Sequence, residues 1–329
     1  MRIAFGFGLA FALLATVTEF GGVPGDVVAV ASQPPRGTVT TGEVNGTNCG
    51  VVTACTSGLK VNFSPQMCGT VTAADGSRWD VPAAVHPGPA AVDVYNDCTG
   101  PGDMPDYLAQ VKTVVVDPDG VEITGYVFAD NYYELYVNGT FIGKDGMGMT
   151  PFNSTVVRFR AKYPITYAIK GVDWETHLGV GMEYDRYNVG DGGVIAHFSD
   201  GTITGPHWKV ETFYIAPLGD PACVTTTNGH DSSACPAEKR PGGNKAPCGL
   251  ADPKTCSALH FAIPGTWTAP GFDDASWVPA TVYPPADVTS TPGYVRHAAL
   301  FGRAEFIWTR NLLLDNVVLA RHTVRGPAR

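Results

Sequence analysis

Two β-strands joined by a tight turn are predicted by the stretch Phe128-Ala-Asp-Asn-Tyr-Tyr-Glu-Leu-Tyr-Val-Asn-Gly-Thr-Phe-Ile-Gly-Lys144, with the turn at Asn138-Gly139. Asn-Gly between apolar and aromatic residues is a strong hairpin signal, because both central positions of a type I′ turn need positive φ. Successive side chains of a strand point to opposite faces of the sheet. One face of the first strand therefore carries Tyr133, Leu135 and Val137, and the other carries Tyr132, Glu134 and Tyr136.

A second informative segment lies far downstream, at Trp267-Thr-Ala-Pro-Gly-Phe-Asp-Asp-Ala-Ser-Trp277. Together with Ala129-Asp-Asn-Tyr-Tyr-Glu-Leu-Tyr-Val-Asn-Gly139, it resembles the galactose-binding-like jelly rolls, β-sandwich modules that accompany many glycoside hydrolases and cell-surface proteins. The two segments stand in the reverse of the order usual in that family. The resemblance implies a jelly-roll fold, a role in binding glycans or cell surfaces, and a structural role for Asp273 and Asp274 in fixing a loop.

Composition also favours a β-rich chain. Only 16% of the 329 residues are charged, and 39 Gly and 26 Pro supply turns, which favours many short strands over helices. From residue 107 onward, apolar runs recur about every ten residues with turn signals between them, as an antiparallel sandwich requires. The predicted fold class is therefore all-β: an antiparallel, jelly-roll-like β-sandwich.

The chain divides into three predicted parts. Residues 1–31 form a signal peptide, with an apolar run after Arg2 and a small-residue site at Ala29-Val30-Ala31. Residues 32–106 form a disulfide-stapled β region, and residues 107–329 form the sandwich, with an inserted loop at 217–256. A competing interpretation places a second, incomplete module from residue 257.

Eight cysteines fall into two groups of four. In an exported chain an even number of cysteines predicts disulfides, and we expect pairing within each group. Zinc is disfavoured, because the chain has no Cys-Xaa-Xaa-Cys and the spacings of the second group are wide. The first group is Cys49, Cys55, Cys68 and Cys98, and the second is Cys223, Cys235, Cys248 and Cys256.

The densest polar cluster is the segment 172–186. If its two predicted strands pair, four carboxylates crowd one surface, and hard oxygen ligands of this kind suit Ca²⁺. The predicted metal ligands are Asp173, Glu175, Glu183 and Asp185. Two alternatives stay open: a solvated sheet face, or the acid and base of a glycosidase.

Aromatic side chains supply the candidate sugar-binding residues, because an aromatic ring stacks on the apolar face of a pyranose. The candidates are Tyr132, Tyr136, Tyr184, Tyr187 and Trp208. Four sequons predict N-glycosylation if the source makes N-glycans. Their acceptors are Asn45, Asn62, Asn138 and Asn153.

Familiar catalytic motifs are missing, including Gly-Xaa-Ser-Xaa-Gly and His-Glu-Xaa-Xaa-His, so no catalytic residue is predicted. A net charge of -9 argues against nucleic-acid partners. The sequence thus predicts a secreted, non-catalytic glycoprotein, with no membrane span once the signal is removed, that binds glycans or cell-surface components. Its only expected cofactor is Ca²⁺. The alternative is a structural subunit that polymerises with copies of itself in an extracellular filament or coat, and a glycoside hydrolase comes third.

Overall fold

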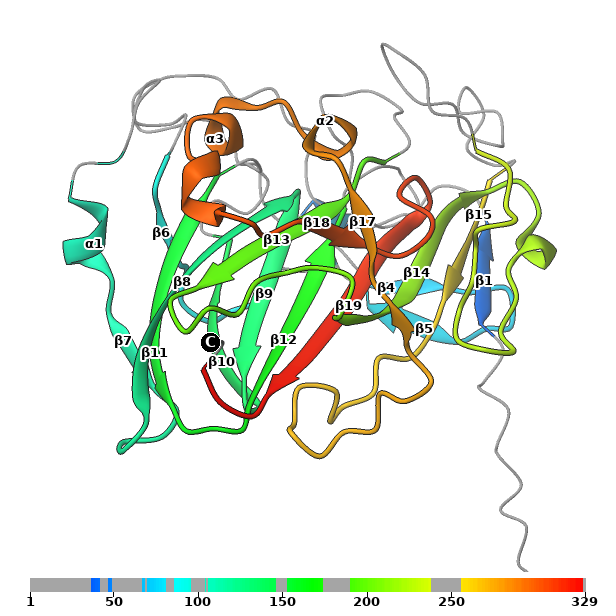
Figure 1. Ribbon diagram of the computed structural model, residues 1–329. Coiled ribbons are helices and arrows are strands. Elements are labelled where there is room, and N and C mark those ends of the chain that lie inside the picture. The colour runs from blue at the N-terminus through cyan, green and yellow to red at the C-terminus, as the bar shows by residue number, and fades with distance from the viewer. Residues whose placement is uncertain are drawn as a thin grey trace, which may run out of the picture. The chain divides into compact units, whose positions relative to one another are not determined.

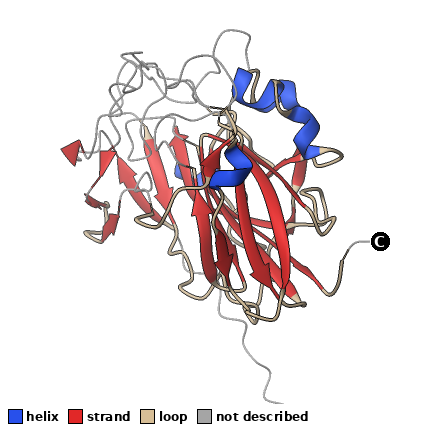
Figure 2. Ribbon diagram, turned by 90° about the vertical axis from the view of Figure 1, so that its left-hand side faces the viewer, coloured by secondary structure: helices blue, strands red, loops and turns tan. Residues whose placement is uncertain are grey.

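The computed structural model describes residues 37–41, 47–48, 67–68, 70–80, 86–95, 104, 106–145, 153–173, 190–237 and 256–327, all within the compact unit Pro34–Arg329 (Figure 1). The predicted signal peptide lies outside these residues. Strands and loops make up nearly all of the described chain, and its helices are short (Figure 2). No described helix is long and apolar enough to cross a membrane.

Two sheets pack face to face, which confirms the predicted β-sandwich. The larger sheet has the order β1 (Thr38–Thr41), β15 (Ser257–His260), β14 (Lys209–Leu218), β19 (Asp315–Val324), β12 (Ile165–Val172), β9 (Tyr132–Val137) and β10 (Thr140–Lys144), with β16 (Val278–Pro279) also beside β14. The smaller sheet has the order β17 (Thr281–Tyr283), β18 (Phe306–Trp308), β13 (Gly193–Phe198), β8 (Val121–Asp130), β11 (Thr155–Ala161) and β6 (Val92–Asp93). All these neighbours are antiparallel; β7 (Thr113–Val115) joins β11 in parallel.

Shorter elements complete the described chain. Two small hairpins pair β2 (Thr47–Asn48) with β3 (Met67–Cys68) and β4 (Thr70–Thr72) with β5 (Arg78–Asp80). The α-helices are α1 (Tyr107–Gln110), α2 (Pro285–Val288) and α3 (Pro292–Val295). Strands β1 and β6 come from the predicted N-terminal region, yet each lies in one of the two main sheets.

The predicted hairpin is confirmed in strands β9 and β10. Asn138 and Gly139 both have positive φ, at 49° and 82°, as a type I′ turn requires. The face of β9 that carries Leu135 lies in the core between the sheets, where it packs with side chains of the smaller sheet such as Phe159. The other face of β9 points away from this core.

The larger sheet is buried on its second face as well. Along β19, Val318 and Ala320 belong to the core between the sheets, whereas Val317 and Leu319 belong to a second apolar cluster on the outer face. The segment 267–277 and the loop that follows β14 contribute side chains to this outer cluster. The sandwich therefore carries a third layer, built from loops, over its larger sheet.

Arg321 of β19 attaches the segment 267–277 to the outer face. Its buried guanidinium donates to Asp274 Oδ2 at 2.8 Å and to the backbone oxygens of Trp267 and Ala269. Asp273 Oδ1 accepts from the backbone N–H of Ala275 at 3.0 Å. Both aspartates hold the loop, which is the role expected for them.

Candidate functional site

Most of the predicted Ca²⁺ face lies outside the described residues. This holds for Glu175, Glu183 and Asp185, and also for the candidate sugar-binding residues Tyr184 and Tyr187. Asp173 is described and buried, and its Oδ2 accepts from the backbone N–H of Gly192 at 3.1 Å. Within the described ranges, no group of three His, Cys, Asp or Glu side chains is arranged to hold a metal ion.

Two of the candidate tyrosines support a buried carboxylate. The hydroxyls of Tyr132 and Tyr136 donate to Glu134 at 3.2 and 2.8 Å, and Lys170 Nζ lies 3.1 Å from the same carboxylate. Tyr132 is 1% exposed, and half-buried Tyr136 packs edge-on against Trp267. The Tyr132 ring is therefore enclosed and has no free face for a sugar.

Trp208 is corrected from a sugar-binding candidate to a core residue. It is fully buried between the sheets, and its indole N–H donates to the backbone oxygen of Ile203 at 2.8 Å. The sequence identified Trp208 as a candidate by its aromatic ring alone, and residue type does not show whether a ring is buried. Burial of the whole ring and its satisfied N–H leave nothing for a ligand to contact.

The two described sequons differ in exposure. Asn138 lies half-buried in the hairpin turn, where its Oδ1 accepts from the backbone N–H of Thr166 at 2.8 Å. Asn153 is only 3% exposed. Because a glycan needs an exposed amide, Asn153 is a poor acceptor in the folded chain; Asn45 and Asn62 lie outside the described residues.

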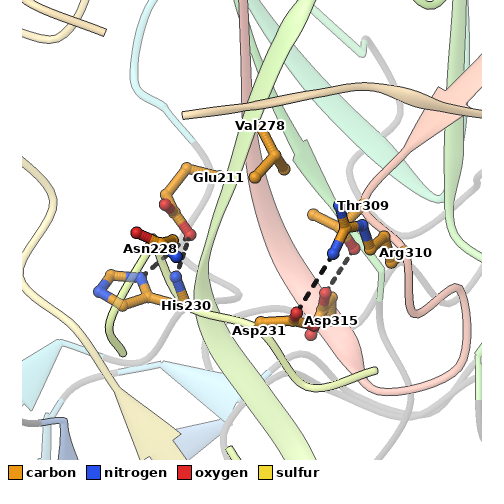
Figure 3. A pocket seen from close by; sticks show the side chains of 8 residues that line it. All are labelled: Glu211, Asn228, His230, Asp231, Val278, Thr309, Arg310 and Asp315. Carbon is orange, nitrogen blue, oxygen red and sulfur yellow. Dashed lines mark hydrogen bonds and ion pairs between the residues drawn. The ribbon is translucent and has the colours of Figure 1, made fainter. Parts of the chain in front are cut away.

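A polar pocket opens between the outer face of the larger sheet and the loop after β14 (Figure 3). Strands β14 and β16 supply Glu211 and Val278. The loop supplies Asn228, His230 and Asp231, and the segment from β18 to the start of β19 supplies Thr309, Arg310 and Asp315. The cavity volume of about 20 Å³ is enough for one or two water molecules.

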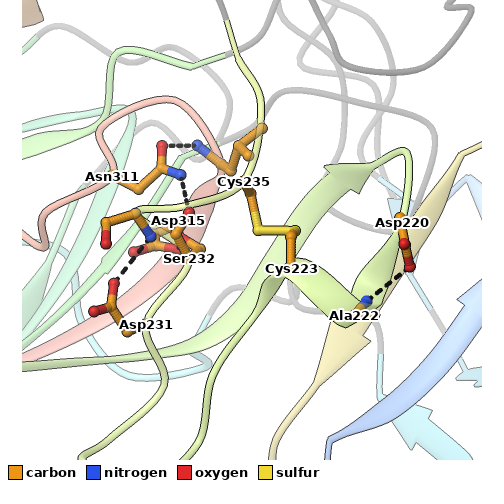
Figure 4. Close-up of a disulfide and its surroundings, with 10 residues drawn as sticks. Asp220, Ala222, Cys223, Asp231, Ser232, Cys235, Asn311 and Asp315 are labelled. Carbon is orange, nitrogen blue, oxygen red and sulfur yellow. Dashed lines mark hydrogen bonds between the residues drawn. A yellow bond between two sulfur atoms is a disulfide. The ribbon is translucent and has the colours of Figure 1, made fainter.

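A disulfide fixes the loop that forms one wall of the pocket (Figure 4). Cys223 and Cys235 are bonded across twelve residues, with their Cα atoms 5.1 Å apart, which confirms that a disulfide staples the predicted loop. Cys256 is also disulfide-bonded. Asn311 adds a cross-connection, because its Nδ2 donates to the backbone oxygen of Ser232 at 2.9 Å.

Glu211 presents one unused oxygen to the pocket. Its Oε1 accepts from the backbone N–H groups of Thr212 and His230 at 3.1 and 2.8 Å. Its Oε2 accepts no hydrogen bond from the described residues and is not fully enclosed. Gly229, at φ +83°, lies so close to Oε2 that a side chain at this position would collide with it. Burial raises the pKa of Glu211 to about 8.

Asp315 lies deeper and has both oxygens occupied. Ser232 Oγ donates to its Oδ1 at 2.6 Å, and Thr309 Oγ1 donates to its Oδ2. Burial raises the pKa of this carboxyl to about 7, against the lowering effect of the two hydroxyls. Asp315 is thus held inside the wall of the pocket by its own hydrogen bonds.

The remaining charged groups of the pocket form a pair near its mouth. Arg310 Nη1 lies 3.4 Å from Asp231 Oδ2, with more than half of the arginine side chain exposed. Although burial acts to raise the pKa of Asp231, hydrogen bonds from Ser233 and the guanidinium of Arg310 outweigh it, and the pKa is lowered. Asp231 is therefore ionised at neutral pH.

His230 is neutral at physiological pH. Its ring stacks on Phe261 with the centroids 3.5 Å apart, and burial lowers its pKa. The Nδ1 atom lies 2.6 Å from the backbone oxygen of Thr212, so Nδ1 carries the proton and donates to that carbonyl. The imidazole thus supports the loop and adds no charge to the pocket.

No family model, curated protein or solved structure matches this chain. The chemistry of the pocket must therefore be inferred from its own residues. A protonated Glu211, an ionised Asp231, an amide and a guanidinium lie within one small space, and together they offer both donors and acceptors. Such a set suits a ligand that carries hydroxyl or amino groups.

Sequence reasoning did not single out the pocket residues. Glu211, His230 and Asp315 are spread over a hundred residues, and none belongs to a local motif. The disulfide loop was the one available signal, because a loop held by a disulfide packs against some surface and this one carries polar residues such as Asn228, His230 and Asp231. Which surface it covers depends on the order of the strands.

Glu211→Gln is expected to gain stability relative to the wild type as the pH rises. The carboxyl has a pKa of about 8 when folded and 4.5 ordinarily, so between pH 6.5 and pH 8 the unfolded state is ionised while the folded state still holds its proton. Burial of this group then disfavours folding by an additional amount of about 1.5 kcal/mol across that range. Urea denaturation at several pH values measures the difference between the two proteins.

The buried histidines, whose pKa values are lowered, titrate alike in both proteins and cancel in this comparison. Asp231→Asn is the matched control, since the pKa of Asp231 is lowered and its contribution is lost only in acid. A Glu211→Gln protein whose stability runs parallel to the wild type from pH 6.5 to pH 8 would contradict the prediction.

Proposed function

We propose that the protein is an extracellular, non-catalytic carbohydrate-binding module whose ligand site is the pocket between β14 and the disulfide loop. The observation that carries the proposal is Glu211 Oε2, which lines the pocket beside Asn228, Asp231 and Arg310 and makes no hydrogen bond with the described residues. Carboxylate, amide and guanidinium groups are the side chains that take the hydroxyls of a sugar. A disulfide-stapled loop fits an oxidising, extracellular compartment.

A glycoside hydrolase is the second candidate, favoured by the pKa of Glu211. A carboxyl that keeps its proton at neutral pH is the form a general acid needs. The second carboxyl of a glycosidase must reach the sugar or its attacking water, however. Asp315 is buried and accepts a hydrogen bond on each oxygen, which argues for binding over hydrolysis.

The edges of the two sheets weigh against a filament subunit built by strand addition. The described edge strands are β1 and β10 in the larger sheet and β6, β7 and β17 in the smaller one, each two to five residues long. Short edge strands offer few unpaired backbone groups to a neighbouring chain. Electron microscopy of the purified protein tests this alternative, which regular filaments would support.

A glycan array followed by titration calorimetry tests the proposed function. Arg310→Ala is expected to weaken binding about tenfold or more, because the substitution removes a guanidinium donor and leaves Asp231 without its cation. Arg325→Ala is the matched control, since Arg325 is exposed and follows β19 at the end opposite to Asp315. If no glycan binds, or if both variants bind as the wild type does, the proposal fails; release of a shortened glycan would establish the hydrolase instead.

A further inference from the structure

The pocket contains more carboxyl groups than cations. The titratable and charged groups that face it are Glu211, His230, Asp231, Arg310 and Asp315. His230 is neutral, and Arg310 pairs with Asp231 at 3.4 Å. Among the described residues, Glu211 and Asp315 therefore have no cationic partner, and both avoid an uncompensated buried charge by keeping a proton.

Among the carboxyl oxygens that line the pocket, one accepts no hydrogen bond from the described residues; both oxygens of Asp231 are engaged, by the backbone N–H of Ser233 and by Arg310. Asp315 has both oxygens occupied by hydroxyls, and Glu211 Oε1 accepts two backbone N–H groups. Glu211 Oε2 remains, on a side chain that is 6% exposed and lines the cavity. Because this oxygen reaches the cavity and no described residue donates to it, a ligand that brings its own hydrogen-bond donors can bind it.

The size of the cavity selects a small group. About 20 Å³ holds one or two groups the size of a water molecule, which admits a single substituent of a sugar and excludes the ring itself. A Ca²⁺ ion needs six to eight oxygen ligands, and most of the carboxyl oxygens here are already engaged. A primary ammonium is about as large as water and carries three N–H donors together with the missing positive charge.

We infer that the pocket takes the primary ammonium group of an amino sugar, such as a glucosamine unit whose nitrogen is not acetylated, with Glu211 Oε2 as the principal acceptor. This inference rests on the proposed carbohydrate-binding function and names the class of glycan. An acetylated nitrogen is neutral, and its acetyl group exceeds the cavity. A hydroxyl fits but brings no charge.

Binding is coupled to the loss of a proton. In the free pocket, Glu211 holds its proton at pH 6.5, because its pKa is about 8. When an ammonium enters, the carboxyl ionises, the proton passes to the buffer, and a carboxylate–ammonium pair remains in place of the neutral acid. An amino group that is already an ammonium in solution therefore releases close to one proton at this pH, whereas one that enters as the neutral amine takes the Glu211 proton and releases none.

The test compares ligands that differ only at the nitrogen. Tetramers of β-1,4-linked glucosamine, N-acetylglucosamine and glucose are titrated at pH 6.5 in phosphate and in imidazole buffer, whose ionisation enthalpies differ. The glucosamine tetramer is expected to bind at least tenfold more tightly than the other two and to release a net fraction of a proton, set by the share of its amines that are ammonium in solution. Methylammonium, the smallest probe, is expected to compete with it at high concentration.

Variants separate the pocket from general attraction between a polycation and an acidic protein. Glu211→Gln is expected to abolish both the tenfold preference and the proton release, with its fold checked by thermal denaturation. Glu305→Gln removes an exposed carboxylate outside the pocket lining and is expected to change neither. If Glu211→Gln keeps the preference and the proton release, the inference is overturned.

The remaining outcomes distinguish this inference from the proposed function. Equal binding of neutral tetramers overturns the ammonium site and leaves carbohydrate binding intact. If methylammonium binds with proton release and no tetramer binds, the ammonium site is supported. The assignment of an amino sugar as its ligand and the proposed carbohydrate-binding function are then both overturned. If none of the probes binds, both proposals fail.

Discussion

Trp308→Ala is expected to lower the free energy of unfolding by about 4 kcal/mol. Trp308 is fully buried between the sheets, and its indole N–H donates to the backbone oxygen of Asp315 at 2.8 Å. The ring lies directly against Gly171 and Gly192, where no side chain would fit. Truncation therefore leaves a large cavity that these neighbours cannot fill, and urea denaturation with an unchanged m-value would measure its cost.

Trp308→Phe separates packing from hydrogen bonding. It keeps most of the ring and leaves the Asp315 carbonyl without its donor, so we expect a loss of about 1–3 kcal/mol. Trp79→Ala is a second comparison, because Trp79 is only half-buried and packs against His260 from the small hairpin of β4 and β5. If the loss for Trp308→Ala did not exceed that for Trp79→Ala, Trp308 would not be the central residue of the core.

Arg321→Met is expected to cost about 3 kcal/mol of unfolding free energy. Methionine keeps the apolar stem against Phe272, over whose ring the guanidinium lies at 5.1 Å. It removes every donor, so the carboxylate of Asp274 and the backbone oxygens of Trp267 and Ala269 lose their partner. The segment 267–277 should loosen, and limited proteolysis would then cut within it before the sandwich unfolds.

The two aspartates provide a graded control for this prediction. Asp274→Asn should lower the free energy of unfolding by less than Arg321→Met does. The Asp274 side chain is 30% exposed, so water can solvate the asparagine amide that replaces the carboxylate. Asp273→Asn should be close to neutral, since asparagine can still accept from the N–H of Ala275. If Arg321→Met left both stability and proteolysis unchanged, the segment would be held by its aromatic side chains alone.

Local sequence predicted the hairpin and its two faces correctly, because alternation along a strand and positive φ at Asn-Gly need no knowledge of the rest of the chain. It could not predict what covers the outer face. Tyr132 does lie on the face opposite Leu135, yet the third layer buries it, so a residue expected to meet sugar supports Glu134 instead.

The pocket was beyond prediction for a related reason. Glu211 and Asp315 become neighbours only because β19 lies beside β14, although about a hundred residues separate them in the chain. Nothing in either local sequence specifies that pairing. A burial pattern shows that a segment is a strand but does not show which strand pairs with it. The raised pKa values of the two carboxyls follow from the burial that this pairing and the covering loop produce.

The position of β19 also bears on how the chain is made. This strand comes after every other strand in sequence, yet it lies in the middle of the larger sheet, between β12 and β14 (Figure 1). During translation, β12 and β14 leave the ribosome before β19, so each has an unpaired edge until β19 is synthesised. Most of the outer layer has already been synthesised by then. Ribosomes that stop short of residue 315 therefore release a chain with two unpaired inner strands, which is prone to pair with other nascent chains. A protein of this topology benefits from chaperones that keep those edges apart until its last strand arrives.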